Sequence, residues 1–308
     1  MFTFSLRIFL RNILGLFAFD YRIVNREQWK AIRDYITIDN LRHFKETDGV
    51  LFKDEIDFIL KHGAQVFPYK KVKSMGPVNS GYDKRAGLPY VMHNGKKLFF
   101  KKSMKVKEAE EAYRSYIEDE NLLGGGYRVK MPHQYQSENV KVEQGDIFVD
   151  IGSAEGLVAL DVIDKVKKVY LLEGDKKWLP SLHATFRPYK DKCQIIPKYV
   201  SDCNSKCYIT LEQLLKDEPD CPVFIKMDIE GYEKIVLDSS RDFIAKRKNI
   251  KLAVCTYHNQ EDAKDIALLF ERLGYHYEQS DGYMLFTFDP QEIPKPPFFR
   301  KGMIRAWK

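Results

Sequence analysis

The sequence of 308 residues lacks the patterns that mark several large classes of protein. It has five cysteines, none in a C-x-x-C pair, which argues against the common zinc-binding motifs and a disulfide framework. It has no arginine-rich run and no zinc-finger spacing, so its net charge of +6 does not by itself indicate nucleic acid. Internal repeats and low-complexity segments are also missing. We therefore expect a globular protein with reduced thiols and no nucleic-acid partner.

A long uncharged apolar run is missing as well. The most apolar segment, 1–19, contains Arg7 and Arg11, and its longest uncharged stretch, 12–19, is far shorter than the ~20 residues that span a bilayer. Apolar residues recur there at helical spacing, which predicts a helix that packs on the protein itself or lies on a membrane surface or a partner. The C-terminal segment 291–308 is also basic and aromatic. We expect a cytoplasmic location, with peripheral membrane contact through the two termini as a further hypothesis.

The sequence does contain enough apolar residues, 44%, to fill a sizeable core. Residues 1–130 read as an accessory region. Helical periodicity covers much of 20–75, and Asn94-Gly95 between two short apolar runs predicts a β-hairpin. A further helix is expected at 108–120. The six lysines between 96 and 107 are typical of a solvated face. The alternative is that they form a patch that binds an acidic acceptor.

The pattern of apolar residues changes after residue 130, and the new pattern continues to about 290. Short apolar runs alternate with helical segments, which predicts βαβ units and a parallel sheet. Asp281-Gly282, between the runs 275–279 and 283–288, predicts a closing antiparallel hairpin. We expect an α/β, Rossmann-like fold with a seven-stranded sheet. The expected strands are 147–151, 168–172, 194–196, 223–227 and 252–255, and the expected helices are 157–166, 178–186, 211–215, 232–237 and 263–273.

The first candidate site follows the opening strand of this domain. The loop runs from Asp150 through Gly152 and Ser153 to Gly156, at the strand edge where open α/β sheets bind ligands. Glycines there let the backbone turn sharply and approach a ligand closely. Glu173 ends the next strand, 21 residues beyond Gly152, a spacing at which an acid accepts hydrogen bonds from a ribose diol.

These features alone fit a nicotinamide dinucleotide or S-adenosylmethionine. The dinucleotide fingerprint G-x-G-x-x-G is not present, because the loop reads D-x-G-x-x-x-G with Ala154 in place of the second glycine. S-adenosylmethionine has no pyrophosphate, and its positive charges favour nearby acids such as Asp150 and Glu155. Ser201 and Asp202 follow a short extended segment and are the candidates for the adenine.

The second candidate site is the acidic turn after the fourth expected strand. It contains Asp228, Glu230 and Glu233. An acid near a helix start can simply cap free N–H groups, which is the reading for Glu233. Asp228 should point into the cleft, and His258, after the fifth strand, can accept a hydroxyl proton near neutral pH.

These motifs together resemble the FkbM family of methyltransferases. The resemblance covers about 131–288 and rests on the glycine loop, Leu172-Glu173, Tyr257-His258 and above all the run from Lys226 to Glu233. It implies a class I methyltransferase fold, S-adenosylmethionine as methyl donor, and O-methylation of a sugar, glycan or secondary metabolite. It implies cofactor roles for Asp150, Gly152, Gly156 and Glu173, and an acceptor side lined by Asp228, Glu230 and His258. Pro132-His133-Gln134-Tyr135 also resembles a family element, with His133 able to contact the cofactor, whereas Glu155 departs from the family pattern.

The mechanism expected from this resemblance is an in-line methyl transfer. His258 or Asp228 would take the acceptor proton, and Glu230 would orient the acceptor or the base. No residue is assigned to a metal, although Asp228 and Glu230 are also suited to a divalent cation. The alternatives are a protein that binds S-adenosylmethionine or a partner without catalysis, and a nicotinamide-dependent oxidoreductase.

Overall fold

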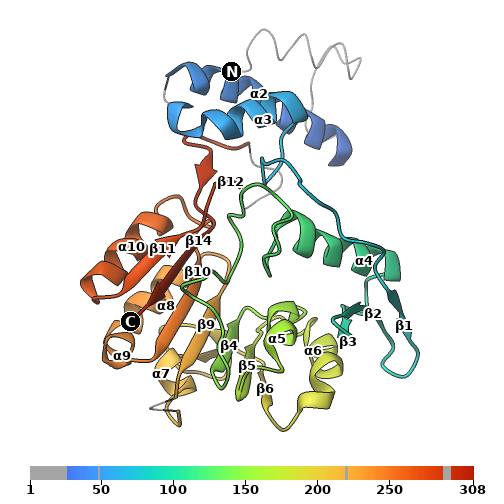
Figure 1. Cartoon of the computed structure of the whole chain (residues 1–308), viewed down its shortest axis with the longest axis vertical. Coiled ribbons are helices and arrows are strands. Elements are labelled where there is room, and N and C mark those ends of the chain that lie inside the picture. The colour runs from blue at the N-terminus through green and yellow to red at the C-terminus, as the bar shows by residue number, and fades with distance from the viewer. Residues whose placement is uncertain (1–25, 48, 219–220, 287–292) are drawn as a thin grey trace. The chain divides into compact units, whose positions relative to one another are not determined.

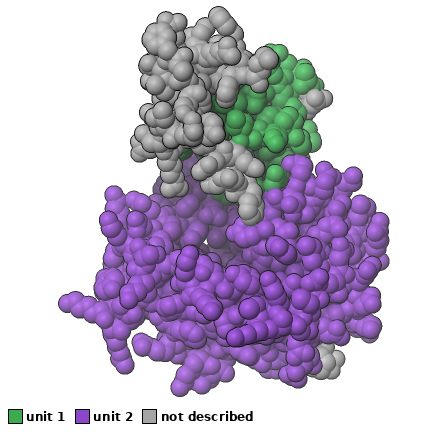
Figure 2. Space-filling view, turned by 180° about the vertical axis from the view of Figure 1, so that it is seen from behind, with its two compact units in different colours: residues 1–69, 283–300 green, residues 70–282, 301–308 purple. Residues whose placement is uncertain are grey.

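The computed structural model describes residues 26–47, 49–218, 221–286 and 293–308, so the helix expected in 1–19 lies outside the described residues. The chain divides into two compact units, which Figure 2 shows in different colours. Unit 1 comprises 1–69 and 283–300, and unit 2 comprises 70–282 and 301–308. The sequence instead placed boundaries at 130 and 290. The units differ from that division because residues 283–300 share an apolar core with the first helices.

Unit 1 is a helical hairpin with a small sheet. Helix α2 (Arg26–Thr47) leads through the 3-10 turn η2 (Gly49–Phe52) into α3 (Lys53–His62), which carries acids in its first turn and bases in its last, as the helix dipole favours. Strands β12 (Met284–Leu285) and β13 (Phe299–Arg300) pair antiparallel. The buried core of this unit consists of Leu41, Phe44, Phe52, Ile56, Ile59, Leu285, Phe298 and Phe299.

Unit 2 opens with a three-stranded antiparallel sheet of β1 (Ser80–Asp83), β2 (Leu88–His93) and β3 (Lys96–Phe99). The predicted hairpin is confirmed: Asn94 and Gly95 both have positive φ, 48° and 79°, as the tightest hairpin turn requires. Helix α4 (Val106–Arg114) follows and continues as one π-helical turn, η3 (Ser115–Asp119). A π turn rotates side chains out of helical register, and here it bears Tyr116.

The main sheet of unit 2 has seven strands in the order β11-β14-β10-β9-β4-β5-β6. Strand β14 is antiparallel to both of its neighbours, and the remaining pairs are parallel, which is the class I methyltransferase arrangement. Figure 1 shows this sheet in the lower part of the chain. Its strands are β4 (Ile147–Ile151), β5 (Lys168–Leu172), β6 (Cys193–Ile196), β9 (Val223–Met227), β10 (Ile250–Cys255), β11 (His276–Gln279) and β14 (Met303–Trp307).

Helices connect these strands, and among the described residues none is long and apolar enough to cross a bilayer. On β4, Ile147, Val149 and Ile151 enter one large apolar core, so the alternating Asp150 faces the other side of the sheet. The connecting elements are α5 (Leu157–Val162), α6 (Leu179–Phe186), η4 (Arg187–Tyr189), the paired β7 (Tyr199–Val200) and β8 (Tyr208–Ile209), α7 (Leu211–Leu214), α8 (Glu233–Ser239), α9 (Arg241–Lys246) and α10 (Asp262–Arg272).

The predicted antiparallel end of the sheet is confirmed, but its second strand comes from a different segment than expected. The described part of the expected strand, residues 283–286, does not pair with β11; that partner is β14, from the segment expected to be a basic tail. The chain leaves the sheet at Ser280 and returns at Met303, where the N–H of Ser280 donates to the Met303 carbonyl. Asp281-Gly282 therefore begins a long connection between β11 and β14 rather than a tight hairpin turn. Arg305, on β14, is buried and pairs with Glu278 of β11 at 2.9 Å.

Candidate functional site

The glycine loop lies against the acidic turn at the carboxyl edge of neighbouring strands β4 and β9. Gly152 has φ +75°, and a Cβ at this position would stand 1.9 Å from the carbonyl oxygen of Asp228. No side chain fits in that space. The N–H of Asp228 in turn donates to Ile151 at 3.1 Å. Gly152 is therefore required because the two motifs are in contact. The close backbone approach expected of this glycine is made to Asp228 of the protein itself.

The next glycine of the loop begins helix α5. Gly156 has φ +83°, and a Cβ would stand 2.6 Å from the ring of Phe186. Ser153 donates from its hydroxyl to the carbonyl of Asp150 at 2.7 Å, which closes the turn. Glu173, at the end of β5, accepts from the N–H of Ala154 at 2.9 Å and from that of Asp175 at 2.7 Å. These bonds fix the Glu173 carboxylate beside the loop, where the sequence predicted a ribose-binding acid.

A buried ion pair lies beneath the loop. Asp150 and Lys226 are register partners on β4 and β9, and their side chains meet at 2.9 Å. The ammonium of Lys226 also donates to the Gly152 carbonyl at 2.6 Å. Burial alone would lower the pKa of Lys226, but Asp150 and Asp228 raise it above its usual value. Lys226 therefore stays charged and connects the loop to the acidic turn.

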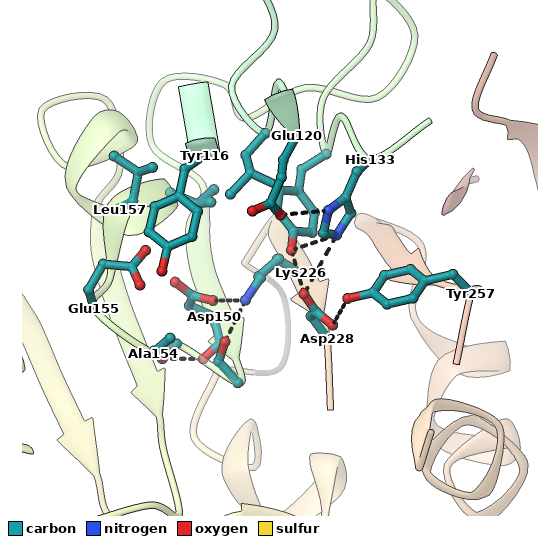
Figure 3. Close-up of a pocket in the computed structure, with 15 residues that line it drawn as sticks. Tyr116, Glu120, His133, Asp150, Ala154, Glu155, Leu157, Lys226, Asp228 and Tyr257 are labelled. Atoms are coloured by element: carbon teal, nitrogen blue, oxygen red, sulfur yellow. Dashed lines mark hydrogen bonds and ion pairs between the residues drawn. The ribbon is translucent and has the colours of Figure 1, made fainter. Parts of the chain in front are cut away.

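Two cavities adjoin the loop, and both are lined by Gly152, Ala154 and Asp228. The larger, about 530 Å³, is lined by Glu173 and by aromatic side chains. The smaller, about 130 Å³, is shown in Figure 3 and has polar walls of both charges. The aromatic residues of the larger cavity are Trp178, Tyr199 and Tyr232, and the charged residues of the smaller are Glu120, His133, Asp150, Glu155, Lys226 and Asp228.

Asp228 is the centre of the polar network between these cavities. Its Oδ2 accepts from the hydroxyl of Tyr135 at 2.8 Å, and its Oδ1 accepts from that of Tyr257 at 3.1 Å. Burial would raise the pKa of Asp228, but His133, Lys226 and His258 lower it well below its ordinary value. Asp228 is therefore an anion throughout the physiological pH range.

Each Asp228 oxygen also faces a histidine that is backed by a glutamate. His133 Nε2 lies 3.7 Å from Oδ2, and its Nδ1 lies 3.1 Å from Glu120. His258 Nε2 lies 3.6 Å from Oδ1, and its Nδ1 lies 3.0 Å from Glu233. Burial would lower both histidine pKa values, but the carboxylates raise that of His133 to about 9 and that of His258 to about 10.

The two histidines differ in their access to the cavities. His133 lines the smaller cavity, whereas His258 lines neither of the two, and 1% of its side chain is exposed. The side chain of Glu230 is 77% exposed at the mouth of the larger cavity, with His258 Nε2 3.5 Å from its carboxylate. An imidazole thus occupies the position beside Asp228 and Glu230 where the sequence also suggested a divalent cation.

Glu155 projects into the smaller cavity opposite the histidine. It is buried, and burial raises the pKa of its carboxyl to about 7. Figure 3 shows the Tyr116 ring directed toward it from the π-helical turn. The charge of Glu155 and burial raise the pKa of Tyr116, so this phenol stays protonated.

The remaining two predicted site residues lie elsewhere. Ser201 donates to Asp202 at 3.0 Å, and neither residue lines either cavity beside the glycine loop. Asp202 instead lines a separate cavity with residues of α7 and α9, such as Glu212 and Lys246. The preceding residues Tyr199 and Val200 reach the larger cavity in their place. Strand β7 ends at Val200, so Ser201 and Asp202 follow it rather than belong to it.

Sequence reasoning missed five residues of this network. Glu120 and Tyr116 come from the accessory region, and nothing in their local pattern distinguishes them from a solvated helix. Lys226, Tyr135 and Tyr257 stood inside motifs that were recognised, but no role was assigned to them. A buried lysine inside a strand was the available signal, because a lysine without an ionic partner is rarely buried.

Comparisons with known proteins agree with this geometry. Residues 106–277 match the family described as the methyltransferase FkbM domain, which is more than half of the chain. A search of curated proteins finds no significant match.

Several solved structures have a similar fold. Precorrin-6y C5,15-methyltransferase from Geobacter metallireducens has a TM-score of 0.37 and 15% identity, covering 55% of this chain and 82% of that one. TYW2 of M. jannaschii, in complex with AdoMet, has a TM-score of 0.40 and 12% identity over 75% and 87%. Trm5b from Pyrococcus abyssi has a TM-score of 0.39 and 11% identity over 75% and 62%. Likenesses this distant do not identify an acceptor.

Proposed function

The chain belongs to the FkbM family of methyltransferases, and on that premise we propose that it transfers a methyl group from S-adenosylmethionine to a hydroxyl oxygen of a sugar, glycan or secondary metabolite. The observation that carries this proposal is the pair of cavities that share Gly152, Ala154 and Asp228. The larger cavity has aromatic walls and a fixed carboxylate. The smaller cavity is lined by charged groups of both signs. Together they complement the two halves of one donor molecule.

The larger cavity suits the adenosyl half of the donor. Glu173 keeps lone pairs for a ribose diol even though each oxygen accepts one backbone N–H. Trp178 and Tyr199 offer aromatic surface for a flat base. Its volume of about 530 Å³ falls within the range of small-molecule sites.

The smaller cavity suits the amino-acid half. An α-amino acid carries an ammonium and a carboxylate, and this cavity is lined by both acids and cations. Glu155 and Asp150 are candidates for the ammonium side, and His133 and Lys226 for the carboxylate side. A nicotinamide dinucleotide, which has two phosphates and no ammonium, matches these walls poorly.

Asp228 is the residue we assign to the acceptor hydroxyl. S-adenosylmethionine supplies a methyl group already bonded to a good leaving group, so the protein's main task is to align the acceptor oxygen. Tyr135 and Tyr257 hold the carboxylate in place, and it can accept a hydrogen bond from the acceptor hydroxyl. Once that oxygen is methylated its proton is strongly acidic, so even a weakly basic Asp228 can accept it.

His258 and Glu230 take supporting roles in this scheme. His258, expected as a base, is enclosed by Asp228, Glu230 and Glu233 and holds the acidic turn together. The exposed Glu230, which adopts φ +57°, can bind a second hydroxyl of the acceptor at the mouth of the larger cavity.

Donor binding tests the first half of the proposal. Calorimetry of the full chain with S-adenosylhomocysteine, the demethylated donor, should show one site, and NAD should not bind. Gly152→Ala should abolish binding, because its Cβ overlaps Asp228. Gly76→Ala is the matched control, since nothing lies within 4 Å of its Cβ position. Binding of NAD in preference to S-adenosylhomocysteine would overturn the proposal.

Methyl transfer tests the second half. Radiolabelled S-adenosylmethionine would be incubated with separate pools of sugars, oligosaccharides, phenolic metabolites and amines. We expect label in a hydroxyl-bearing acceptor, recovered as a methyl ether that resists mild base. Label confined to the amine pool would contradict O-methylation, and donor binding without transfer to any pool would favour a non-catalytic donor-binding protein.

A further inference from the structure

Glu155 is a carboxyl group buried in the small cavity without an ion pair among the described residues. Lys226 lowers the pKa of this carboxyl, whereas two further acids, Asp150 and Glu120, raise it. Lys226 is already engaged with Asp150 at 2.9 Å and with the Gly152 carbonyl. Tyr116, which packs over the carboxyl from the π-helical turn, is a neutral phenol. The cavity is lined by four acids and two bases, and Glu155 is the acid among them that has no ion pair with a described residue.

We propose that Glu155, covered by Tyr116, is the site that recognises the ammonium group of the methyl donor, and that donor binding expels a proton from it. This inference rests on the proposed function, and it adds a coupling between donor affinity and pH. Before binding, Glu155 holds a proton because an isolated charge is costly in a buried cavity. The bound ammonium supplies the missing positive charge, so the carboxyl ionises.

The proton balance fixes the direction of the effect. The protonated carboxyl and the donor ammonium combine to give a carboxylate–ammonium pair and one proton released to solvent. Since the unbound protein holds more protons, affinity rises with pH until Glu155 is already ionised. The pKa of its carboxyl, raised by burial to about 7, sets the upper end of that rise.

Four groups around Glu155 keep their charge state in the relevant window, whereas burial raises the pKa of Asp150 against its ion pair with Lys226. His133, on the far wall, has its pKa raised to about 9, and the pKa of Lys226 is raised further. Tyr116 stays neutral, and Asp228 stays ionised. A change in donor affinity between pH 5.5 and 7.5 therefore points to an acid of this cavity, and replacing Glu155 shows whether it is that one.

The test is calorimetry of the full chain with S-adenosylhomocysteine, which carries the same ammonium, at pH 5.5 and 7.5 in two buffers of different ionisation enthalpy. We expect affinity about 25-fold tighter at pH 7.5, from a single group titrating near pH 7. Nearly one proton should be released per site at pH 5.5 and about a quarter of one at pH 7.5. 5′-Methylthioadenosine, which lacks the amino acid, should bind without this pH dependence.

Variants assign the effect to the residue. Glu155→Gln should bind S-adenosylhomocysteine more weakly at pH 7.5, with no proton release and less than a threefold change between the two pH values. Glu212→Gln, at an exposed glutamate of α7, is the matched control and should behave like the parent. Tyr116→Phe should retain the proton release, since the carboxyl remains buried.

The outcomes separate this inference from the proposed function. Equal affinity at both pH values with no proton release, or an unchanged pH dependence in Glu155→Gln, would overturn the inference and leave the donor site standing. Failure of S-adenosylhomocysteine to bind at any pH would instead overturn the proposed function.

Discussion

Two histidine–glutamate pairs stand on either side of Asp228, and they are alike in chemistry but not in surroundings. Each histidine places Nε2 3.6–3.7 Å from one Asp228 oxygen and Nδ1 3.0–3.1 Å from a glutamate. Each is accompanied by a tyrosine that donates to the same Asp228 oxygen. The His133 pair lines a cavity and its Glu120 is 24% exposed, whereas the His258 pair is closed off and its Glu233 is fully buried.

The difference shows that two chemically similar pairs can have different roles in one site. A buried pair that no ligand can reach contributes to the shape of the backbone, and here Glu233 also accepts from the N–H of Ile229 in the acidic turn. A pair that borders a cavity can respond to a ligand. We therefore expect His258 to matter for stability and His133 to matter for binding and turnover. The following experiments can break or sharpen that contrast.

The largest effect should come from the residue between the pairs. Asp228→Asn keeps the shape but removes the charge that organises both histidines and the acceptor hydroxyl. We expect kcat/KM for methyl transfer to fall by about 10³-fold, within the range for loss of a positioned acid or base. Affinity for S-adenosylhomocysteine should change far less. Near-parent turnover in this variant would remove Asp228 from the mechanism.

Loss of the enclosed histidine should come next. His258→Ala leaves Glu233 buried without its positive partner, which should lower the free energy of unfolding by about 3 kcal/mol in urea denaturation. His133→Ala should lower it by about half as much, because water reaches Glu120, while weakening donor binding. His183→Ala, at an exposed position of α6, is the control. Equal destabilisation by His258→Ala and His133→Ala would contradict the difference between the two pairs.

The tyrosines should give a smaller difference. Tyr135→Phe and Tyr257→Phe each remove one hydroxyl that donates to the Asp228 anion, a bond worth about 1.5–3 kcal/mol when one partner is charged. We expect the larger loss of stability for Tyr135, since its bond is shorter, 2.8 Å against 3.1 Å. Urea unfolding of the two single variants and the double variant measures both effects and their coupling.

The pH dependence of stability should show the smallest effect. The pKa values of His133 and His258 are raised in the folded protein, to about 9 and about 10. Their stabilisation is therefore complete below the unfolded value near 6.5 and is lost as pH rises toward 9–10. Between pH 7 and 8 the parent should lose about 1 kcal/mol more than His258→Ala. A parallel pH profile for the two proteins would contradict the charged state of His258.

Much of the fold followed from local patterns. Strands β4, β5 and β9 begin and end where the apolar runs predicted, because a strand buried on both faces shows as a nearly continuous apolar run. The second antiparallel strand did not follow, because Asp281-Gly282 satisfies the rules for a hairpin locally. Its neighbours Tyr283 and Leu285 find their apolar partners in unit 1 instead. A turn motif predicts that the chain changes direction, but it does not predict which strand the following segment pairs with.

The candidate site divides in a similar way. Gly152, Gly156, Glu173 and Asp228 were predicted because loops at the ends of parallel strands meet at one edge of a sheet, and all but Gly156 line the two cavities there. Ser201 and Asp202 were placed by analogy and lie away from the cavities beside the glycine loop. Tyr116 and Glu120 were missed because they reach the site from a helix that is far away in sequence and polar in composition.

By itself the sequence determined the order of strands and helices, the glycine loop, and the acids that end the strands, since all of these depend on neighbours within a few residues. The tertiary structure decided which ionisable groups became buried and what faced them. Charge state depends on solvent access and on partners brought together by packing, so only the folded chain separates His133 from His258 and leaves Glu155 without an ion pair among the described residues.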